Sequence, residues 1–569
     1  MTIERRELST DVLIIGGGAA GAMAAIKAMN KGAETLVVTK GNFPSGNTSI
    51  AAWGYAVALG NADPRDNPQV HFEDAIKTGN GLNDRKLLRT WVTKIVEITR
   101  EMDSWGNLPL IREDDKLAQR PFDGHTYPRM VHLNNTTGKA VTQCLGSKGK
   151  EMGLPVLENT IVGGILKKDG KVVGAWGIQY QTGELLFIRA KAIILATGGL
   201  GHLYPITDNV KTITGEGYTL GFRAGAELIG MEFCHFVPTI RYPERMRGRG
   251  PVSNLLDNGG AGLYNALGER FIKKYYPDTM EKGRSSEELT RAIGLEIGEG
   301  KGTARGTVYL DTSNVPPEVQ KELFSEVWDN AARAGVDLNY QPIELSTHPH
   351  DHVGGVRIDV TASTAVPGFF AAGEAAGGSH GASRFAGGAL ADALAFGAIA
   401  GESAADYAKQ LEKPSPWDEQ QLAEVQNRIE TLLSTKEGVK PSELQESIQM
   451  VAYTYLNAGR NEKGLNKALG ELQRLEQQMI PQMSAWAEDQ EQRAFRLREA
   501  IEVDGQLELS KIIATAALCR QESRGKYYGG HYRSDFPTQD DKNWLKNIIL
   551  KRELDGAISY RTELPVMED

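Results

Sequence analysis

The feature that most constrains this chain is a glycine pattern near its N-terminal end. Gly16, Gly18 and Gly21 follow a short apolar run at 11–15 and open a helical pattern that extends to about residue 30. In a strand–turn–helix unit, the first glycine permits a tight turn, the second lets the backbone approach a pyrophosphate, and the third lets the helix pack on the strand. The pattern therefore predicts an α/β fold with a parallel sheet that binds a dinucleotide at its first turn.

The acidic residue that usually follows such a motif is missing here. About 20 positions after the glycines, a carboxylate normally binds the ribose hydroxyls of the dinucleotide. In this chain the second apolar run, 35–38, ends in Thr39 and Lys40. Other groups must therefore hold the ribose. Two later apolar runs, 191–195 and 368–372, end in small-residue turns and are predicted to rejoin the same sheet.

The length of the chain indicates several domains. With 569 residues, 40% of them hydrophobic and 24% charged, it has the composition of an ordinary globular protein. The mixed pattern between the returning strands predicts a second domain inserted into the first, and a later stretch rich in Glu, Gln, Leu and Ala predicts helices. The expected division is a dinucleotide-binding domain in two parts, 1–235 and 354–412, an inserted domain at 236–353, a helical domain at 413–510 and an irregular tail at 511–569.

Charge and cysteine content exclude several classes of function. The net charge is −9 and no long run of Lys or Arg occurs, which argues against a nucleic-acid partner. Cys144, Cys234 and Cys519 are too far apart to suggest a disulfide framework or a metal cluster. No apolar run reaches about 18 residues and residues 1–10 are polar, so we expect neither a membrane span nor a signal peptide. The expected location is the cytoplasm, with any membrane attachment made through a partner subunit.

Further strings carry a specific resemblance to a known family. In chain order they are Gly46-Asn47-Thr48-Ser49-Ile50-Ala51-Ala52-Trp53-Gly54, Ala196-Thr197-Gly198-Gly199, Thr214-Gly215-Glu216-Gly217, Ala371-Ala372-Gly373-Glu374 and Ser379-His380-Gly381-Ala382-Ser383-Arg384. This order resembles the flavoprotein subunits of succinate dehydrogenase and fumarate reductase, a superfamily that includes L-aspartate oxidase and the adenylylsulfate reductase flavoprotein. The tail, with strings at 522–525 and 531–537, also resembles the family's C-terminal signature.

The resemblance implies FAD as the dinucleotide and a Rossmann-like FAD-binding domain with an inserted α+β capping domain. Membrane-bound family members attach FAD through a histidine, and Asn47 stands at that position here, so we expect non-covalent FAD. Glu374 is expected near the ribityl chain of the flavin. The expected cofactor-binding residues are Gly16, Gly18, Ala19, Ala20, Gly21, Thr39, Lys40, Gly46, Asn47, Thr48, Ala52, Gly54, Ala196, Thr197, Gly198, Glu216, Gly373, Glu374, Ala389 and Leu390.

The substrate site departs from the family pattern at several positions. The histidine of the family's Q-F-H-P-T-G string falls on Val237, and His235 stands two residues earlier. The family's T-E substrate pair falls on 253–254, which reads Ser-Asn. The arginine that donates a proton in the R-D-V-V-S-R string falls on Ser286, with Arg284 two residues away as a substitute. A serine hydroxyl cannot replace a guanidinium as both anion ligand and acid.

Two substrate-site residues of the family are retained. His350 matches the histidine of the H-Y-T-M-G-G string, and Arg384 matches the arginine that clamps a substrate carboxylate. The catalytic candidates are therefore His350, Arg384, Arg284 and His235, and no metal site is expected. The resemblance implies hydride exchange between flavin N5 and an anionic small organic substrate. It also implies electron exchange with a separate iron–sulfur, ferredoxin-like subunit.

Two other interpretations stay open at this point. One is an adenylylsulfate-reductase-like flavoprotein, and the other is an electron-transferring subunit with no substrate of its own. The arginine-rich stretch 241–251 is either a solvated basic loop or a surface that recruits anions through guanidinium groups.

Overall fold

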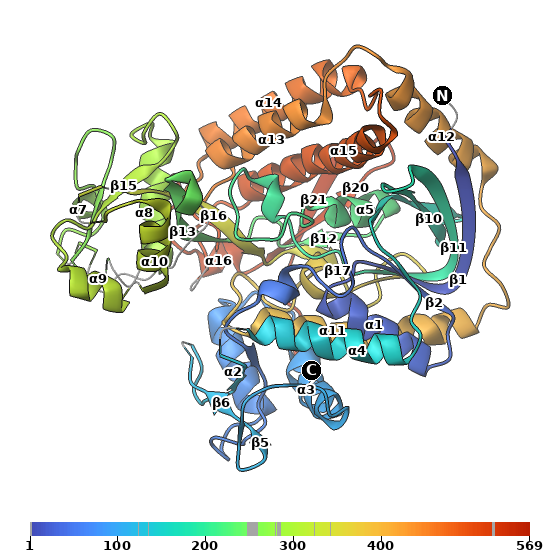
Figure 1. The fold of residues 1–569 in the computed structure, drawn as a ribbon, viewed down its shortest axis with the longest axis horizontal. Coiled ribbons are helices and arrows are strands. Elements are labelled where there is room, and N and C mark those ends of the chain that lie inside the picture. Colours follow the sequence, from blue (N-terminus) through green and yellow to red (C-terminus); the bar gives the residue numbers. More distant parts are fainter. Residues whose placement is uncertain are drawn as a thin grey trace.

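The computed structural model describes residues 3–122, 124–134, 136–246, 256, 260–278, 280–281, 286–323, 325–338, 340–341, 343–525 and 530–568. Three regions are visible in Figure 1. The large sheet and the helices on it occupy the right and lower parts of the view, a smaller unit lies at the left, and the C-terminal helices run along the top.

The large sheet is built around β1 (Arg5–Ile15), which pairs in parallel with β2 (Thr35–Val38) and β11 (Glu184–Leu195). The strand order is β8-β2-β1-β11-β10-β9, and β18 (Phe369–Ala371) pairs in parallel with β11. The strands at the two ends of this order are β8 (Val156–Leu157) and β9 (Thr160–Lys168), and β10 (Lys171–Gln179) lies between β11 and β9. The two later apolar runs therefore rejoin the first sheet, as predicted.

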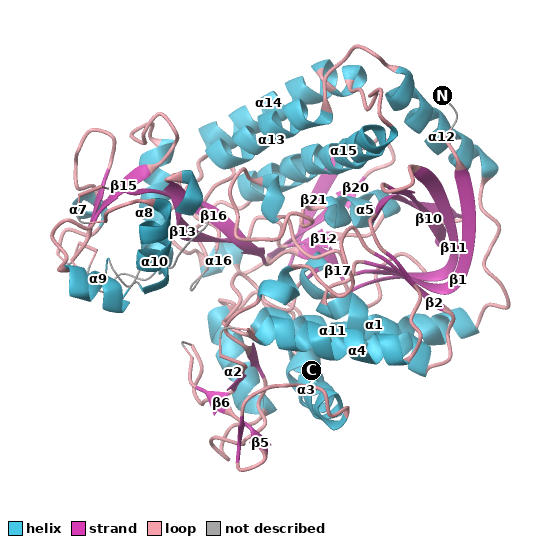
Figure 2. Cartoon of the chain, in the orientation of Figure 1, coloured by secondary structure: helices cyan, strands magenta, loops and turns pink. Residues whose placement is uncertain are grey.

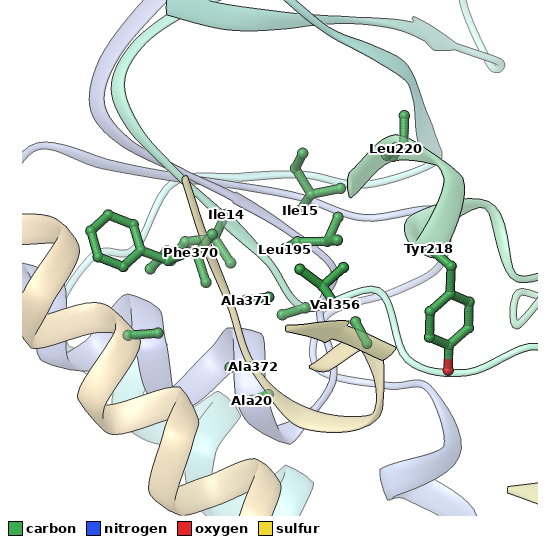
Figure 3. Packing of buried hydrophobic residues seen from close by; sticks show 14 of the residues in the cluster. Ile14, Ile15, Ala20, Leu195, Tyr218, Leu220, Val356, Phe370, Ala371 and Ala372 are labelled. Atoms are coloured by element: carbon green, nitrogen blue, oxygen red, sulfur yellow. The ribbon is translucent and has the colours of Figure 1, made fainter. Parts of the chain in front are cut away.

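Four strands of this sheet end at one edge. Ile15 lies opposite Val38 on one side and Leu195 on the other, and Leu195 lies opposite Ala371. Figure 3 shows Ile15, Leu195 and Ala371 close together, with Ala20 lower in the view near Ala372. Because parallel strands point the same way, the turns that follow them meet at this edge, which is where open α/β sheets bind ligands.

Helices α1 (Ala19–Asn30) and α11 (Gly388–Lys409) pack closely together against this sheet. A Cβ atom at Gly397 would lie 2.5 Å from Ala20 O, and one at Gly401 would lie 2.2 Å from Ala24 O. Glycine thus allows the two helix backbones to touch. Helices α2 (Pro68–Thr78), α3 (Arg85–Ser104) and α4 (Thr137–Glu151) complete this side of the molecule in Figure 2.

The smaller unit has its own sheet and its own apolar core. The antiparallel order is β13-β16-β15-β14, with β13 at Cys234–Tyr242 and β16 at Ile343–His352. Ile240, Leu310 and Leu345 belong to a core cluster separate from the main one. The other elements of this unit are β14 (Gly262–Tyr264), β15 (Val308–Asp311), α7 (Ile272–Tyr275), α8 (Ser286–Gly298), α9 (Pro317–Leu323) and α10 (Ser325–Ala334). The limits 236–353 stay a prediction.

The C-terminal helices lie where their periodicity predicts them. They are α12 (Glu419–Ser434), α13 (Pro441–Tyr455), α14 (Glu462–Gln478) and α15 (Gln490–Cys519). Asp418, Asn461 and Asp489 cap three of them by accepting a backbone N–H of the first turn, which explains where these helices begin. Within the described part of the chain, every helix is too short or too polar to cross a bilayer.

The end of the chain is more regular than the sequence predicts. β20 (Asn547–Arg552) and β21 (Ile558–Glu563) form a hairpin that joins a five-stranded sheet in the order β19-β17-β12-β20-β21. Two six-residue strands carry too little periodicity to be recognised, and their partner β12 (Leu228–Ile229) lies far away in sequence. The remaining strands of this sheet are β17 (Gly355–Arg357) and β19 (Ala376–Gly377).

The close packing of Gly21 in the glycine turn can be tested through the free energy of unfolding, without the cofactor. A Cβ atom at Gly21 would lie 2.0 Å from Gly16 O, so Gly21→Ala must shift backbone and is expected to cost about 1–3 kcal/mol. Gly470, inside α14, has no atom within 4 Å of such a Cβ, so Gly470→Ala should stabilise the helix by up to about 1 kcal/mol. Urea unfolding of both apoproteins measures the difference. A Gly21→Ala protein as stable as the wild type would contradict the packing.

Candidate functional site

The first part of the site is the turn between β1 and α1. Gly16 has φ +115°, and a Cβ atom there would lie 2.0 Å from Ala196 O, so only glycine fits. α1 has Gly18 as its N-cap, so the capping position carries no side chain, and Thr48 Oγ1 accepts from Ala19 N. A helix N-terminus with glycine at its N-cap leaves backbone N–H groups of the first turn and a positive dipole end for an anion. This turn therefore suits a pyrophosphate.

A second helix begins in the same way beside the first. α11 has Gly387 as its N-cap, with φ +75° and no side-chain cap, and the predicted cofactor residues Ala389 and Leu390 lie in its first turn. A Cβ atom at Gly373 would lie 2.9 Å from Ala20 Cβ, so the turn after β18 also approaches α1 closely. Two helix N-termini with glycine N-caps and a glycine-lined surface fit one extended anionic ligand.

Lys40 lies in a buried group of charged side chains next to this turn. Its Nζ donates to Glu216 Oε1 at 2.8 Å and to Glu502 Oε1 at 3.1 Å. Burial lowers the pKa of Lys40, but these two carboxylates raise it above its ordinary value. The sequence predicted Lys40 and Glu216 as cofactor residues, and the structure brings them together. It did not predict Glu502, which comes from α15 and carries no local signal.

The segment that carries Asn47 connects the nucleotide side of the site with the substrate side. Asn47, at the start of η1 (Asn47–Ile50), donates through Nδ2 to Asn209 Oδ1 at 2.8 Å, and its Oδ1 accepts from Val210 N at 3.1 Å. Asn209 in turn donates to His350 O at 2.9 Å. Thr48 accepts from Ala19 N at 3.1 Å, which fixes η1 against the start of α1.

The other predicted cofactor residues lie on turns and short segments around the same edge. Thr39 follows β2 and Gly46 precedes η1, Ala52 and Gly54 lead into β3 (Tyr55–Ala56), Ala196 to Gly198 follow β11, and Glu374 lies in η4 (Gly373–Ala375). The buried Thr197 hydroxyl has no hydrogen-bond partner among the described residues. A buried hydroxyl without a partner, together with two helix N-termini that have glycine N-caps and a nearby lysine, fits FAD, and the individual contacts stay predictions.

Glu374 lies between the nucleotide edge and the smaller unit. Its Oε1 accepts from His352 N at 3.1 Å, and a Cβ atom on Gly199 would lie 2.1 Å from the same oxygen. Burial, together with the nearby Asp351 carboxylate, raises the pKa of Glu374 to about 7. This side chain therefore joins the turn after β11 to the end of β16.

The second part of the site crosses the β13–β16 pair. His235 lies opposite Asp351 in the strand register, and its Nδ1 donates to Asp351 Oδ1 at 2.5 Å. Arg384 donates to both Asp351 oxygens, through Nε at 2.8 Å and Nη2 at 3.0 Å. Burial alone would raise the pKa of Asp351, but the Arg384 guanidinium holds it well below its ordinary value. Burial also holds the pKa of His235 well below its ordinary value, so this imidazole is neutral.

His350 joins this arrangement from a β-bulge. The register passes from the His235–Asp351 pair to Phe236 opposite Pro349, so His350 is the extra residue. A bulge re-aims a side chain, and the His350 ring lies 5.2 Å from the His235 ring at 81°. Its Nδ1 donates to Asp208 Oδ2 at 2.5 Å. Burial lowers the pKa of His350, but Asp208 outweighs it and raises the pKa to about 9.

Asp208 also faces a second histidine. His348 Nε2 lies 3.5 Å from Asp208 Oδ2, so this carboxylate stands between two imidazoles. No sequence signal pointed to Asp208, because it lies in a loop 142 positions before its partner. Of the other substrate-site predictions, Arg284 and the pair at 253–254 lie outside the described residues.

The charges of this group oppose a bound cation. Ligand atoms of His235, His350 and Asp351 lie within 4.8 Å of one another, which is a spacing open to a metal ion. However, Asp351 already binds the Arg384 guanidinium on both oxygens, and His350 is protonated at neutral pH. These side chains form a network of ion pairs and hydrogen bonds, the histidine–aspartate network. Its members are His235, Asp351, Arg384, His350, Asp208 and His348.

Comparison with known proteins agrees with this geometry. Residues 11–390 match the family model described as FAD binding domain, and residues 445–566 match the one described as fumarate reductase flavoprotein C-term. One subunit of the fumarate reductase (CoM/CoB) of Methanothermobacter marburgensis is 35% identical over 552 residues, which cover 96% of this chain and 97% of that protein.

Solved structures extend the likeness to the whole fold. Sdh1 of Mycobacterium smegmatis, in complex with UQ1, superimposes on this chain with a TM-score of 0.90 at 31% identity. The match covers 100% of this chain and 95% of the Sdh1 chain. The adenylylsulfate reductase of Archaeoglobus fulgidus, at 20% identity and a TM-score of 0.75 with 100% and 98% covered, shares the fold. Fold and site thus define an FAD-dependent oxidoreductase. The chain belongs to the family of fumarate reductase and succinate dehydrogenase flavoprotein subunits.

A substitution at Gly18 can test cofactor binding without disturbing the fold. Its φ of −78° suits any residue, and a Cβ atom there would lie 3.6 Å from Thr48 Oγ1, its nearest neighbour. Gly18→Ala should therefore fold normally, while its methyl group takes space needed by the pyrophosphate and weakens FAD binding by roughly tenfold or more, about 1.4 kcal/mol. FAD titration of the apoproteins measures this, with Gly470→Ala as control. Unchanged affinity would contradict the site.

Proposed function

We propose that this chain oxidises or reduces an anionic organic substrate at a CH–CH bond, with Arg384 and His350 as the residues that bind it. The observation that carries this proposal is the histidine–aspartate network, which gathers both residues around Asp351 and Asp208. It adjoins the nucleotide edge through Glu374 and His352. The name of the Methanothermobacter marburgensis relative, a fumarate reductase, supports an unsaturated carboxylate as the oxidised substrate.

The cofactor supplies two-electron chemistry, because a bound flavin can give or accept a hydride at N5. The residues that would hold it are those of the β1–α1 turn, the start of α11 and the Lys40 group. Asn47 is an amide engaged with Asn209 and Val210 and offers no nucleophile for attachment. We therefore propose that FAD is bound non-covalently. Acid precipitation should leave all flavin in the supernatant, and flavin that stays in the pellet would contradict this.

Arg384 is held in one orientation for its task. Besides the two bonds to Asp351, its Nη1 donates to Phe385 O at 3.0 Å. A guanidinium fixed at three nitrogens loses little further freedom when an anion approaches. Asp351 and His235 thus position the arginine, and His350 provides a second cation on the same side of the β13–β16 pair.

Electrons must also leave or enter the chain. Cys144 and Cys234 are buried and Cys519 is partly buried, and three cysteines are too few for the four thiolates of an iron–sulfur cluster. In line with the family resemblance, we propose a separate iron–sulfur, ferredoxin-like partner that exchanges electrons with the flavin. A cytoplasmic location, with membrane attachment only through that partner, stays part of this proposal.

The other interpretations have less support. The likeness to adenylylsulfate reductase is one of fold, at 20% identity. A protein that only transfers electrons has no need for an arginine held by a carboxylate and a histidine on β13 and β16. This built arrangement favours a chain with its own substrate.

Stopped-flow reoxidation of the reduced flavoprotein by fumarate and other unsaturated carboxylates tests the proposal. Arg384→Gln should slow reoxidation by about 100-fold, because it removes a charged donor, while FAD stays bound. Arg384→Lys should keep part of the rate. The control is Arg561→Gln, an exposed arginine on β21 that pairs with Glu227. Full activity in Arg384→Gln would refute the site, and a silent wild type would favour the electron-transfer interpretation.

A further inference from the structure

Within the histidine–aspartate network, His350 is the imidazole that combines a carboxylate partner with an open face. Its side chain is 44% exposed, whereas His235 is 2% exposed and His348 is 4% exposed. Neither of the two buried histidines offers a nitrogen at the surface of the site. A group that passes a proton to a substrate and recovers it from solvent must have such a surface.

The contacts of His350 fix which of its nitrogens is available. Nδ1 is held by Asp208 at 2.5 Å, and the backbone carbonyl of His350 accepts from Asn209 at 2.9 Å. The bulge keeps the ring on the side of the β13–β16 pair where His235 and Arg384 meet Asp351. With Nδ1 engaged, Nε2 is the nitrogen left to exchange a proton.

We propose that His350 transfers the substrate proton through Nε2 and that Asp208 is its positioning residue, a role that rests on the function proposed above. In the reducing direction, one substrate carbon receives the hydride. The Nε2–H bond of His350 breaks, and a C–H bond forms at the neighbouring carbon. The imidazole becomes neutral and regains a proton from solvent. Oxidation runs in reverse, so the hydride carries both electrons and the proton carries none.

The charges around His350 favour the protonated imidazole at neutral pH. Asp208 and Asp351 stabilise the positive form, while Arg384 and partial burial oppose it, and the net effect is a pKa raised to about 9. The titratable and charged groups that face His350 are Asp208 from the loop after η2 (Gly201–Leu203), His348 and Asp351 from β16, His235 from β13, Glu374 from η4 and Arg384 from the loop before α11.

Two arguments separate this role from the alternatives. Ser286, which falls on the family's arginine position, carries a hydroxyl that is a poor acid. A guanidinium donor such as Arg284 keeps its proton at every accessible pH, so it gives no limb in a pH–rate profile below about pH 12. A donor with the environment of His350 gives a rate that falls as pH rises through about 9.

The first measurement needs neither substrate nor reduced cofactor. NMR titration of protein with isotope-labelled histidine gives the pKa of His350, whose signal is the one missing in His350→Gln. We expect a His350 pKa of about 9 in the wild type and of 6.5 or lower in Asp208→Asn. Without the Asp208 charge, only Asp351 still raises this pKa, whereas burial and Arg384 continue to lower it. Asp208→Glu should restore most of the shift. Asp406→Asn, which breaks an exposed pair with Lys31, is the control.

The second measurement is the pH profile of flavin reoxidation by the carboxylate that oxidises the wild type. His350→Gln should reduce the reoxidation rate by about 100-fold or more. In Asp208→Asn, the pH at which the rate falls should move from about 9 to 6.5 or below. Visible flavin absorbance and circular dichroism verify that both variants are folded and loaded. If Asp208 only supported its loop, Asp208→Asn would change the amount of folded protein, and the pH at which the reoxidation rate falls would stay the same.

Each outcome decides the proposal. A shifted pKa and a shifted limb in Asp208→Asn, with recovery in Asp208→Glu, support it. If the FAD-bound variants keep the wild-type rate and the wild-type pH dependence, the proton-transfer role is refuted while the proposed function stands. An unshifted His350 pKa in the wild type overturns it as well. Silence of the wild type with every unsaturated carboxylate removes the proposed function and this role together.

Discussion

The contact on which this structure depends is the backbone approach at the β1–α1 turn. Gly16 lies against Ala196 and Gly21 lies against Gly16, at distances that leave no room for a methyl group. This approach brings α1 down onto the sheet edge where β1, β2, β11 and β18 end. α11 follows, since its own glycines rest on α1. The position of the two helix N-termini with glycine N-caps is a consequence of this packing, and so is the space for a pyrophosphate.

The substrate side depends on strand register in the same strict way. His235 meets Asp351 because β13 and β16 pair at that position, and His350 reaches the same group because it is the extra residue of a bulge. A slip of one residue would send every one of these side chains to the other face. Each cation of the network has a carboxylate beside it, Arg384 with Asp351 and His350 with Asp208. Such pairing is what allows charged groups to remain in a largely buried site.

Much of this could be predicted from the sequence, because the signals are local. The glycine pattern, the apolar runs at 35–38, 191–195 and 368–372 and the helical periodicity after residue 413 all correspond to elements of the fold. His350 and Arg384 were predicted through matched strings and His235 as a histidine two residues before a family position, and the structure brings all three together. Asp208 and Glu502 were missed because they reach the site from distant loops and helices, and single carboxylates in such segments look like solvated charges.

The crystal structure of the FAD-loaded protein with a small carboxylate bound is the most direct test of the account. We predict the pyrophosphate at the N-terminus of α1 and the carboxylate in contact with Arg384 and with Nε2 of His350, next to the flavin ring. A carboxylate bound elsewhere, or a flavin ring remote from the histidine–aspartate network, would contradict the claim that one site joins these two parts.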